Sequence, residues 1–281
     1  MDNICFIGGD SRNKILFNLF KEKNRKVCEY GLTSIENCVK ENIQEMKNMI
    51  QGSKYIITSI PFSKDKININ SKYAEISIEN FIKFSKNKII YTGSMDSKTV
   101  ELLEKNNNVV IDVIKDPDFA IKNAIPTAEG VIKIIIENTD ITIWKSNIAL
   151  IGFGRVGKRI AEVLNKLGAN IWCYDIKKEE VANIKMCGYN VLKDICESLE
   201  QKDIIINTVP ETIIKEQNLK YISKDSLIVD VASESGGIDF KYAEINNYKC
   251  IHALGLPGNI APKSAASYIK EIMEKYENMR C

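Results

Sequence analysis

Short apolar runs of strand length alternate along this chain with segments in which apolar residues recur every three or four positions. Continuous apolar strands separated by amphipathic helices are typical of a parallel sheet that helices cover on both faces. The sequence therefore predicts an α/β fold. The expected strands cover residues 4–7, 26–30, 54–60, 88–92, 108–113, 148–151, 170–174, 189–192, 203–207, 226–230 and 248–251, and the expected helices 11–20, 77–85, 97–105, 131–137, 158–167 and 264–277.

The strand at 148–151 leads into three glycines with the spacing G-x-G-x-x-G. In a dinucleotide-binding turn the first glycine permits a tight bend, the second lets the backbone approach a pyrophosphate, and the third lets helix and strand pack closely. An acid about 20 residues further on, at the end of the next strand, binds the ribose hydroxyls. A glycine-rich turn without a ligand is the alternative. The predicted cofactor-binding residues are Gly152, Phe153, Gly154, Arg155, Val156, Gly157 and Asp175, with Thr208, Val209 and Pro210 after the strand 203–207.

The 281 residues suffice for two domains. Pro117 and Pro126 both disfavour a continuing helix, and Thr127 is placed to N-cap the helix 131–137, which we expect to cross between the domains. We expect two Rossmann-like parallel-sheet domains with an interdomain cleft, and a C-terminal helix that returns to the first domain. Residues 1–124 and 256–281 would form the substrate domain, and 125–255 the NAD(P)-binding domain.

Three strands of the first half end in small or polar residues, in the loops 8–10, 59–61 and 92–94. Loops at the carboxyl edge of a parallel sheet lie side by side and bind ligands. We expect backbone N–H groups and hydroxyls there to hold carboxylates. Arg12, close to the first loop, either holds a substrate or lies in solvent beside a helix cap.

Charge and cysteine content exclude several classes of function. Lys and Arg number 39 and Asp and Glu 37, so the net charge of +2 gives no long-range attraction for nucleic acid or an anionic membrane. No apolar run approaches the roughly 18–20 residues of a membrane span, and the first residues begin a strand rather than a signal peptide. We expect a soluble, cytoplasmic protein. The eight cysteines form no C-x-x-C pair and there is one histidine, so we predict unpaired thiols and no metal site.

Six segments, in the same order along the chain, resemble the dipicolinate synthase A subunits. They are 8–12 (GGDSR), 125–130 (IPTAEG), 139–143 (TDITI), 152–157 (GFGRVG), 236–244 (GGIDFKYAE) and 255–258 (GLPG) with 261–263 (APK). That family is similar in layout to D-2-hydroxyacid dehydrogenases and S-adenosylhomocysteine hydrolases. The resemblance implies NAD(P)-dependent oxidation of a dihydrodipicolinate to pyridine-2,6-dicarboxylate during endospore formation, and it implies the flavodoxin-like B subunit of dipicolinate synthase for a partner. Whether the chain also forms a homo-oligomer stays open.

The choice between NAD and NADP also stays open. The family leans toward NADP, whereas Asp175 would repel a 2′-phosphate, although Lys177 and Lys178 follow it. Two other functions remain as alternatives: a D-2-hydroxyacid-type dehydrogenase that acts on another small acid, and a regulatory protein that senses NAD(P) without turnover.

Oxidation of a dihydropyridine dicarboxylate requires a clamp on two carboxylates more than it requires catalytic groups, because aromatisation supplies much of the driving force. Arg12, Ser94, Ser233 and Lys263 are the candidates for the clamp, each against the alternative of a solvated charge or a capping hydroxyl. Candidate acids or bases are His252 and Glu129. The remaining expected substrate contacts are Gly9, Asp10, Ser59, Thr127 and Gly258.

Overall fold

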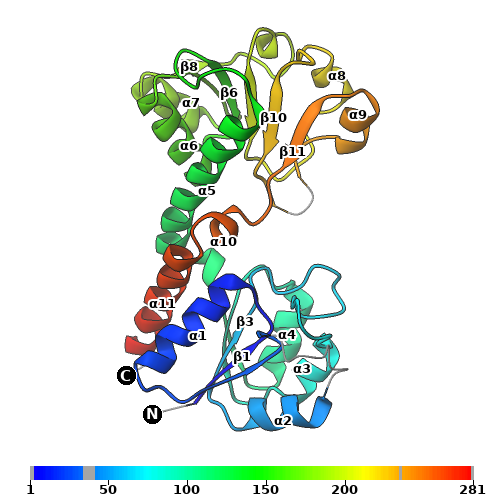
Figure 1. Ribbon diagram of the computed structural model, residues 1–281, viewed down its shortest axis with the longest axis vertical. Coiled ribbons are helices and arrows are strands. Elements are labelled where there is room, and N and C mark those ends of the chain that lie inside the picture. The colour runs from blue at the N-terminus through cyan, green and yellow to red at the C-terminus, as the bar shows by residue number, and fades with distance from the viewer. Residues whose placement is uncertain (1–2, 34–41, 234–235, 280–281) are drawn as a thin grey trace. The chain divides into compact units, whose positions relative to one another are not determined.

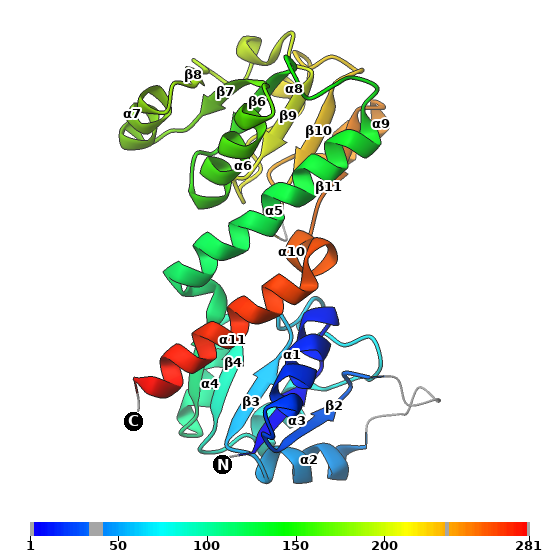
Figure 2. The ribbon, with the colours of Figure 1, turned by 60° about the vertical axis from the view of Figure 1, so that its left-hand side comes forward.

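The computed structural model describes residues 3–33, 42–233 and 236–279 of the chain. It divides into two compact units, which we call unit 1 (residues 1–122 and 261–281) and unit 2 (residues 123–260) (Figures 1 and 2). Each unit is a parallel sheet with helices on both faces. The predicted fold class is thereby confirmed, and each of the eleven expected strands is present with small differences at its ends.

The sheet of unit 1 is parallel throughout, in the order β2-β1-β3-β4-β5. This is the flavodoxin-like order, which reverses between the first and third strands, and ligands of open parallel sheets bind at such a reversal. The loops after β1 and β3 therefore mark the edge that can receive a ligand. The strands are β1 (Ile4–Ile7), β2 (Val27–Tyr30), β3 (Tyr55–Thr58), β4 (Ile89–Thr92) and β5 (Val109–Asp112).

Helices cover both faces of this sheet with separate apolar layers. On one face Phe6, Leu16 and Met273 are fully buried between the sheet, α1 and α11, which lie side by side in Figure 1. The C-terminal helix therefore packs on the first unit, as predicted. On the other face Met46 of α2, Phe81 of α3 and Leu103 of α4 are fully buried, so these three helices cover the sheet there. The helices are α1 (Ser11–Glu22), α2 (Ile43–Gln51), α3 (Ile78–Phe84), α4 (Ser97–Lys105), a 3-10 turn (Val113–Lys115), the first turns of α5 (Pro117–Asn138), and α11 (Pro262–Asn278).

The sheet of unit 2 has the order β11-β10-β9-β6-β7-β8, which reverses between β9 and β6. This is the Rossmann order, with two mononucleotide-binding halves that meet at the reversal. Its strands are β6 (Asn147–Ile151), β7 (Asn170–Tyr174), β8 (Asn190–Val191), β9 (Ile204–Asn207), β10 (Leu227–Asp230) and β11 (Lys249–His252). Its helices, besides the rest of α5, are α6 (Arg155–Lys166), α7 (Lys178–Met186), a 3-10 turn (Glu197–Leu199), α8 (Glu216–Leu219), α9 (Phe240–Ile245) and α10 (Leu256–Ile260).

Pro117 is the first residue of α5, so the expectation that a helix does not continue through it is confirmed, whereas the break expected at Pro126 is wrong. α5 runs without interruption from Pro117, where a missing N–H costs nothing, through Pro126 to Asn138. The hydroxyl of Thr127 donates to the carbonyl of Asn123, 2.9 Å away, so Thr127 lies in the helix interior and does not cap its start. The division between the units, at 122 and 123, falls one turn before Pro126.

The expected loop at 255–263 is also different, because α10 forms within it. A Cβ on Gly130 would lie 2.9 Å from Cδ2 of Leu256 and 3.1 Å from Cγ1 of Ile260. The absent side chain of Gly130 therefore lets α10 pack directly on α5. This contact places residues 256–260 in unit 2, whereas the sequence had placed them in the first domain.

The six cysteines among the described residues are free thiols, and Cys38 and Cys281 lie outside those residues. Cys28 and Cys5 face each other on β2 and β1. A hydrogen bond from the Cys5 thiol lowers the pKa of Cys28 to about 7, whereas burial raises the pKa of Cys173 and of Cys250 to about 12.

Iodoacetamide at pH 7.5 should therefore alkylate Cys28 well before Cys173 and Cys250, because the thiolate is the nucleophile. The rate at Cys28 should rise with pH and level off roughly one pH unit above its pKa of about 7. Peptide mass spectrometry of timed samples measures both, with Cys28→Ser as the blank. Equal alkylation rates at the three thiols would contradict the lowered pKa of Cys28.

None of the helices in the described part of the chain combines the length and apolar character needed to cross a bilayer.

Candidate functional site

The glycine loop between β6 and α6 has a distinct geometry at each glycine. Gly152 has a φ of +90°, and a Cβ there would meet the Thr208 hydroxyl at 2.4 Å. A Cβ on Gly157 would lie 2.1 Å from the carbonyl oxygen of Gly152, so α6 packs against the end of β6. At Gly154, in contrast, a Cβ would meet nothing within 4 Å. The three positions fit the bend, the close packing and the open approach that a dinucleotide-binding turn requires.

Gly154 is the N-cap of α6, and no side chain caps this helix end. The first N–H groups of a helix lack intrahelical partners and carry the positive end of the helix dipole. An uncapped helix start behind an open glycine is therefore a site for a pyrophosphate. Arg155, which follows, is exposed and adds a positive charge. On these observations the residues present fit a dinucleotide.

Side chains from two neighbouring strands hold this loop in place. The backbone N–H of Phe153 donates to Oδ2 of Asp175 (2.8 Å), and the N–H of Lys177 donates to Oδ1 (2.9 Å). The hydroxyl of Thr208 lies 3.1 Å from the carbonyl oxygens of Ile151 and Gly152. Asp175, expected at a ribose, thus also ties the glycine loop to the end of β7.

Two buried polar residues lie beside these loops at the carboxyl edge of unit 2. Asn207 and Asp230 end the adjacent strands β9 and β10, are directly opposite each other, and are completely buried. The amide nitrogen of Asn207 donates to Oδ1 of Asp230 (2.9 Å). Asp230 was not among the predicted site residues, although it is a polar residue at the end of an apolar strand, as Asn207 is.

His252 ends β11 opposite Asp230, and its ring stacks on Phe240 with centroids 4.7 Å apart. Its Nε2 is buried and has no hydrogen-bond partner among the residues that the structure describes. A Cβ on Gly236 would lie 3.5 Å from this nitrogen, so the imidazole faces the loop that also contains Ser233. Ser233 itself is exposed.

In unit 1 the carboxyl edge brings together Asp10 and Arg12. Asp10 caps α1, and its carboxylate accepts bonds from Nε (3.1 Å) and Nη2 (2.6 Å) of Arg12. Nη2 also donates to the carbonyl of Ile60. The side chain of Arg12 is 7% exposed, so it is neither the solvated charge that the sequence allowed nor an isolated cation.

The loops after β3 and β4 are joined, because the N–H of Phe62 donates to the carbonyl of Gly93 (2.8 Å). Ser59 is buried and its hydroxyl bonds to the carbonyl of Phe62 (2.9 Å), whereas Ser94 is exposed and has a φ of +56°. Of these two hydroxyls, that of Ser94 faces solvent. The other predicted residues are placed as follows: Gly9 is buried before Asp10, Lys263 is exposed at the start of α11, Glu129 is exposed within α5, and Gly258 is buried within α10.

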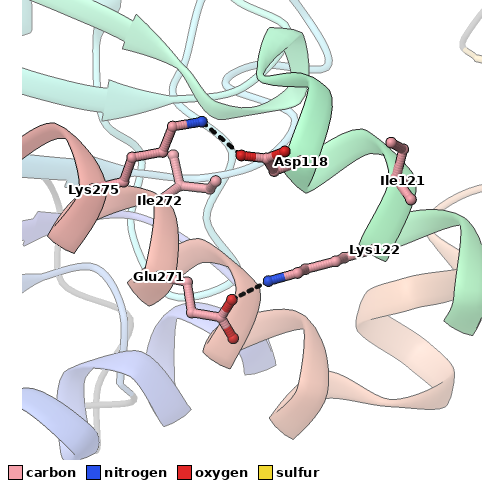
Figure 3. A pocket seen from close by; sticks show the side chains of 6 residues that line it. All are labelled: Asp118, Ile121, Lys122, Glu271, Ile272 and Lys275. Carbon is pink, nitrogen blue, oxygen red and sulfur yellow. Dashed lines mark hydrogen bonds and ion pairs between the residues drawn. The ribbon is translucent and has the colours of Figure 1, made fainter.

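A pocket of about 310 Å³ lies in unit 1 between the start of α5 and α11 (Figure 3). Two ion pairs cross it, Lys275 with Asp118 (2.7 Å) and Lys122 with Glu271. The pocket contains none of the predicted site residues. In the described ranges, no three His, Cys, Asp or Glu side chains gather as a metal site.

Comparison with known proteins finds a family match for each of two segments of the chain. Residues 3–114 match the N-terminal domain of the dipicolinate synthase A subunits, and residues 136–235 match the NAD binding domain of D-isomer specific 2-hydroxyacid dehydrogenases. Unit 2 is therefore an NAD(P)-binding domain of an oxidoreductase type.

The whole chain also has relatives of the same layout. It is 29% identical over 280 residues to the dipicolinate synthase A subunit of Bacillus subtilis (strain 168), in a match that covers 97% of this chain and 94% of that protein. The crystal structure of the Bacillus halodurans A subunit aligns with a TM-score of 0.85 at 26% identity, over 98% of this chain and 97% of that one. The crystal structure of the Bacillus subtilis counterpart gives 0.84 at 28% identity, over 99% and 96%.

Proposed function

We propose that this chain, which resembles the dipicolinate synthase A subunits from end to end, oxidises a dihydrodipicolinate to dipicolinate (pyridine-2,6-dicarboxylate) with NAD(P)+. The oxidation removes two hydrogens from the ring, one as a hydride and one as a proton. Bound NAD(P)+ supplies the hydride acceptor. The dehydrogenase type rests on the NAD-binding domain, and the ring substrate and its use in endospore formation are our proposal.

The observation that carries the proposal is the match of residues 3–114 to the N-terminal domain of the A subunits. The NAD-binding domain alone does not select a substrate, because 2-hydroxyacid dehydrogenases act on different acids. The match includes the carboxyl edge of unit 1 that holds Asp10, Arg12 and Ser94. We therefore assign recognition of the dicarboxylate to this edge.

Within the proposal, the residues of the chain bind and orient two carboxylates. Ser94 and Lys263 are exposed and offer a hydroxyl and an ammonium group. Ser233 offers a second hydroxyl from unit 2. Arg12 shares its guanidinium between the Asp10 carboxylate and the Ile60 carbonyl, so we expect it to shape the edge as much as to bind substrate. His252 and Glu129 remain the candidates to accept the ring proton.

The test is turnover with the product of dihydrodipicolinate synthase as substrate. Purified protein with NAD+ or NADP+ should produce dipicolinate and reduced cofactor in equal amounts, followed by their absorbance. Turnover of 2-hydroxy acids without dipicolinate would favour a D-2-hydroxyacid-type dehydrogenase. Cofactor binding without turnover of either substrate would favour a protein that senses NAD(P).

The relatives are named as subunits, which implies a partner. We propose that this partner is the flavodoxin-like B subunit of dipicolinate synthase, with self-association into a homo-oligomer left as a separate question. Co-purification with the B subunit, together with a higher turnover rate in its presence, would support this assignment. An unchanged rate and separate elution on a sizing column would contradict it.

Lys263→Ala should raise KM for the dihydrodipicolinate about tenfold and leave cofactor affinity unchanged, because it removes one charge from the carboxylate clamp. Arg12→Ala should raise KM as well, but it should also destabilise unit 1 by about 1–3 kcal/mol, since it leaves the Ile60 carbonyl without its donor. Steady-state kinetics and thermal unfolding separate these effects. The matched control is Lys220→Ala, which breaks an exposed pair with Glu216 and should change neither. A KM for Lys263→Ala equal to that of the wild type would remove Lys263 from the clamp.

A further inference from the structure

We propose that Asn207 and Asp230 are positioning residues that fix the two loops which receive the nicotinamide half of the dinucleotide. This inference rests on the use of NAD(P) in the proposed function, but not on the identity of the ring substrate. In the Rossmann order, the two nucleotide halves lie on opposite sides of the reversal in strand order. Asp175, directly after β7, marks the adenosine side, so β9 and β10 belong to the nicotinamide side.

The pair holds the backbone of both loops at once. Asn207 donates to the carbonyl of Val209 (2.9 Å) and accepts from its N–H (3.2 Å), which fixes the turn after β9. Asp230 accepts from the N–H of Ala232 (3.0 Å) with Oδ1 and from the N–H of Gly237 (2.6 Å) with Oδ2. The carboxylate thus holds the backbone at Ala232 and at Gly237, and the bond between the two side chains couples these two positions to the turn at 208–209.

The backbone at Gly236 and Gly237 packs closely against the side chains of Asn207 and Asp230. A Cβ on Gly237 would lie 2.1 Å from the amide nitrogen of Asn207. Gly236 has a φ of +66°, and a Cβ there would lie 2.9 Å from Oδ2 of Asp230. No side chain larger than hydrogen fits between the loop and the pair at either position. At Gly236 the ring of Phe240 is equally close, with Cε2 at 2.7 Å from such a Cβ, so the backbone at 236 and 237 packs on this ring as well as on the polar pair.

The burial of the Asp230 carboxylate favours a role in cofactor binding over a role in the stability of unit 2. Asp230 is completely buried, and the donors shown for it are neutral amides. A carboxyl group buried among neutral donors contributes less to the stability of a core than apolar residues of the same size do. What the carboxylate provides is two directed bonds to the backbone of one loop. Groups held in this way can align a bound ring for hydride transfer.

Asp230→Asn tests the assignment, because it keeps the size of the side chain but turns one acceptor into a donor that faces an N–H group. The probes are NAD+ and ADP-ribose, which lacks the nicotinamide, or NADP+ and 2′-phospho-ADP-ribose if the wild type prefers NADP. Calorimetric titration gives the ratio of the two dissociation constants. We expect Asp230→Asn to reduce the advantage of the dinucleotide over ADP-ribose at least about tenfold, while the affinity for ADP-ribose stays within about twofold of the wild type. Asn207→Ser should act in the same direction and is the second variant if Asp230→Asn does not fold.

The matched control is Asp203→Asn. Oδ2 of Asp203 accepts from the N–H of Asn147 (2.7 Å), so it also binds backbone with a carboxylate, but at the opposite edge of the same sheet. This variant should lower the stability of unit 2 without changing the ratio of the dissociation constants for the dinucleotide and ADP-ribose. Equal weakening of both ligands in Asp230→Asn, an unchanged ratio, or a wild type that does not distinguish the two ligands would each overturn the proposal. A wild type that binds NAD(P) but does not oxidise dihydrodipicolinate would refute the proposed function and leave this measurement valid.

Discussion

Gly154→Val should abolish cofactor binding and leave the fold of unit 2 intact. A Cβ at this position meets no atom of the described residues within 4 Å, and the backbone, with φ of −75° and ψ of −166°, is extended and open to any residue. The added isopropyl group would therefore point into the space in front of the α6 N-terminus, where a pyrophosphate binds. We expect the dissociation constant for NAD(P)+ to rise by about 100-fold or more, equivalent to about 2.7 kcal/mol.

Calorimetric titration measures the affinity, and thermal unfolding without cofactor should give a Tm within about 2 °C of the wild type. Gly154→Ala should give a smaller loss of affinity, since a methyl group fills less of the space. Gly52→Ala, at the C-cap of α2 in unit 1, is the control for replacement of an ordinary glycine and should bind normally. Retained affinity in Gly154→Val would refute the assignment of the glycine loop.

The strands and the glycine loop could be predicted because their signals are local. An apolar run such as 148–151 is buried on both faces and forms a strand wherever it lies in a parallel sheet. The three glycines act within a few residues of one another, so their spacing alone carries the geometry. Whether a helix continues through a proline depends instead on tertiary packing. Ala124, Ala128 and Val131, in the turns on either side of Pro126, are buried, and this packing outweighs the hydrogen bond that Pro126 cannot make.

The partners of the site residues could not be predicted in the same way. Asn207 and Asp230 meet only because β9 and β10 are neighbours in register, and no local pattern states that register. The role of Arg12 depends on the carbonyl of Ile60, 48 residues away, and on a capping carboxylate whose geometry appears only with the helix. Sequence reasoning thus identified which residue types lie at the carboxyl edges, whereas the pairing of their side chains required the fold.

Gly157→Ala should destabilise unit 2 strongly, in contrast to any change at Gly154. An alanine Cβ at position 157 would lie 2.1 Å from the carbonyl oxygen of Gly152 and 3.1 Å from its carbonyl carbon, and both are backbone atoms that cannot rotate away. Relief requires α6 to move from the end of β6, which opens the layer in which Ile160 and Leu164 are buried. We expect a loss of about 3 kcal/mol or more, and a Tm lower by roughly 5–10 °C.

Gly154→Ala is the matched control, because it adds the same methyl group three residues earlier into open space. It should leave the Tm unchanged or raise it slightly, since alanine restricts the unfolded chain more than glycine does. Thermal and denaturant unfolding followed by tryptophan fluorescence report on this unit, because both tryptophans of the chain, Trp144 and Trp172, lie in unit 2. If the two alanine variants unfold at the same temperature, α6 does not pack on β6 through Gly157, and the third glycine of the motif has no structural role in this chain.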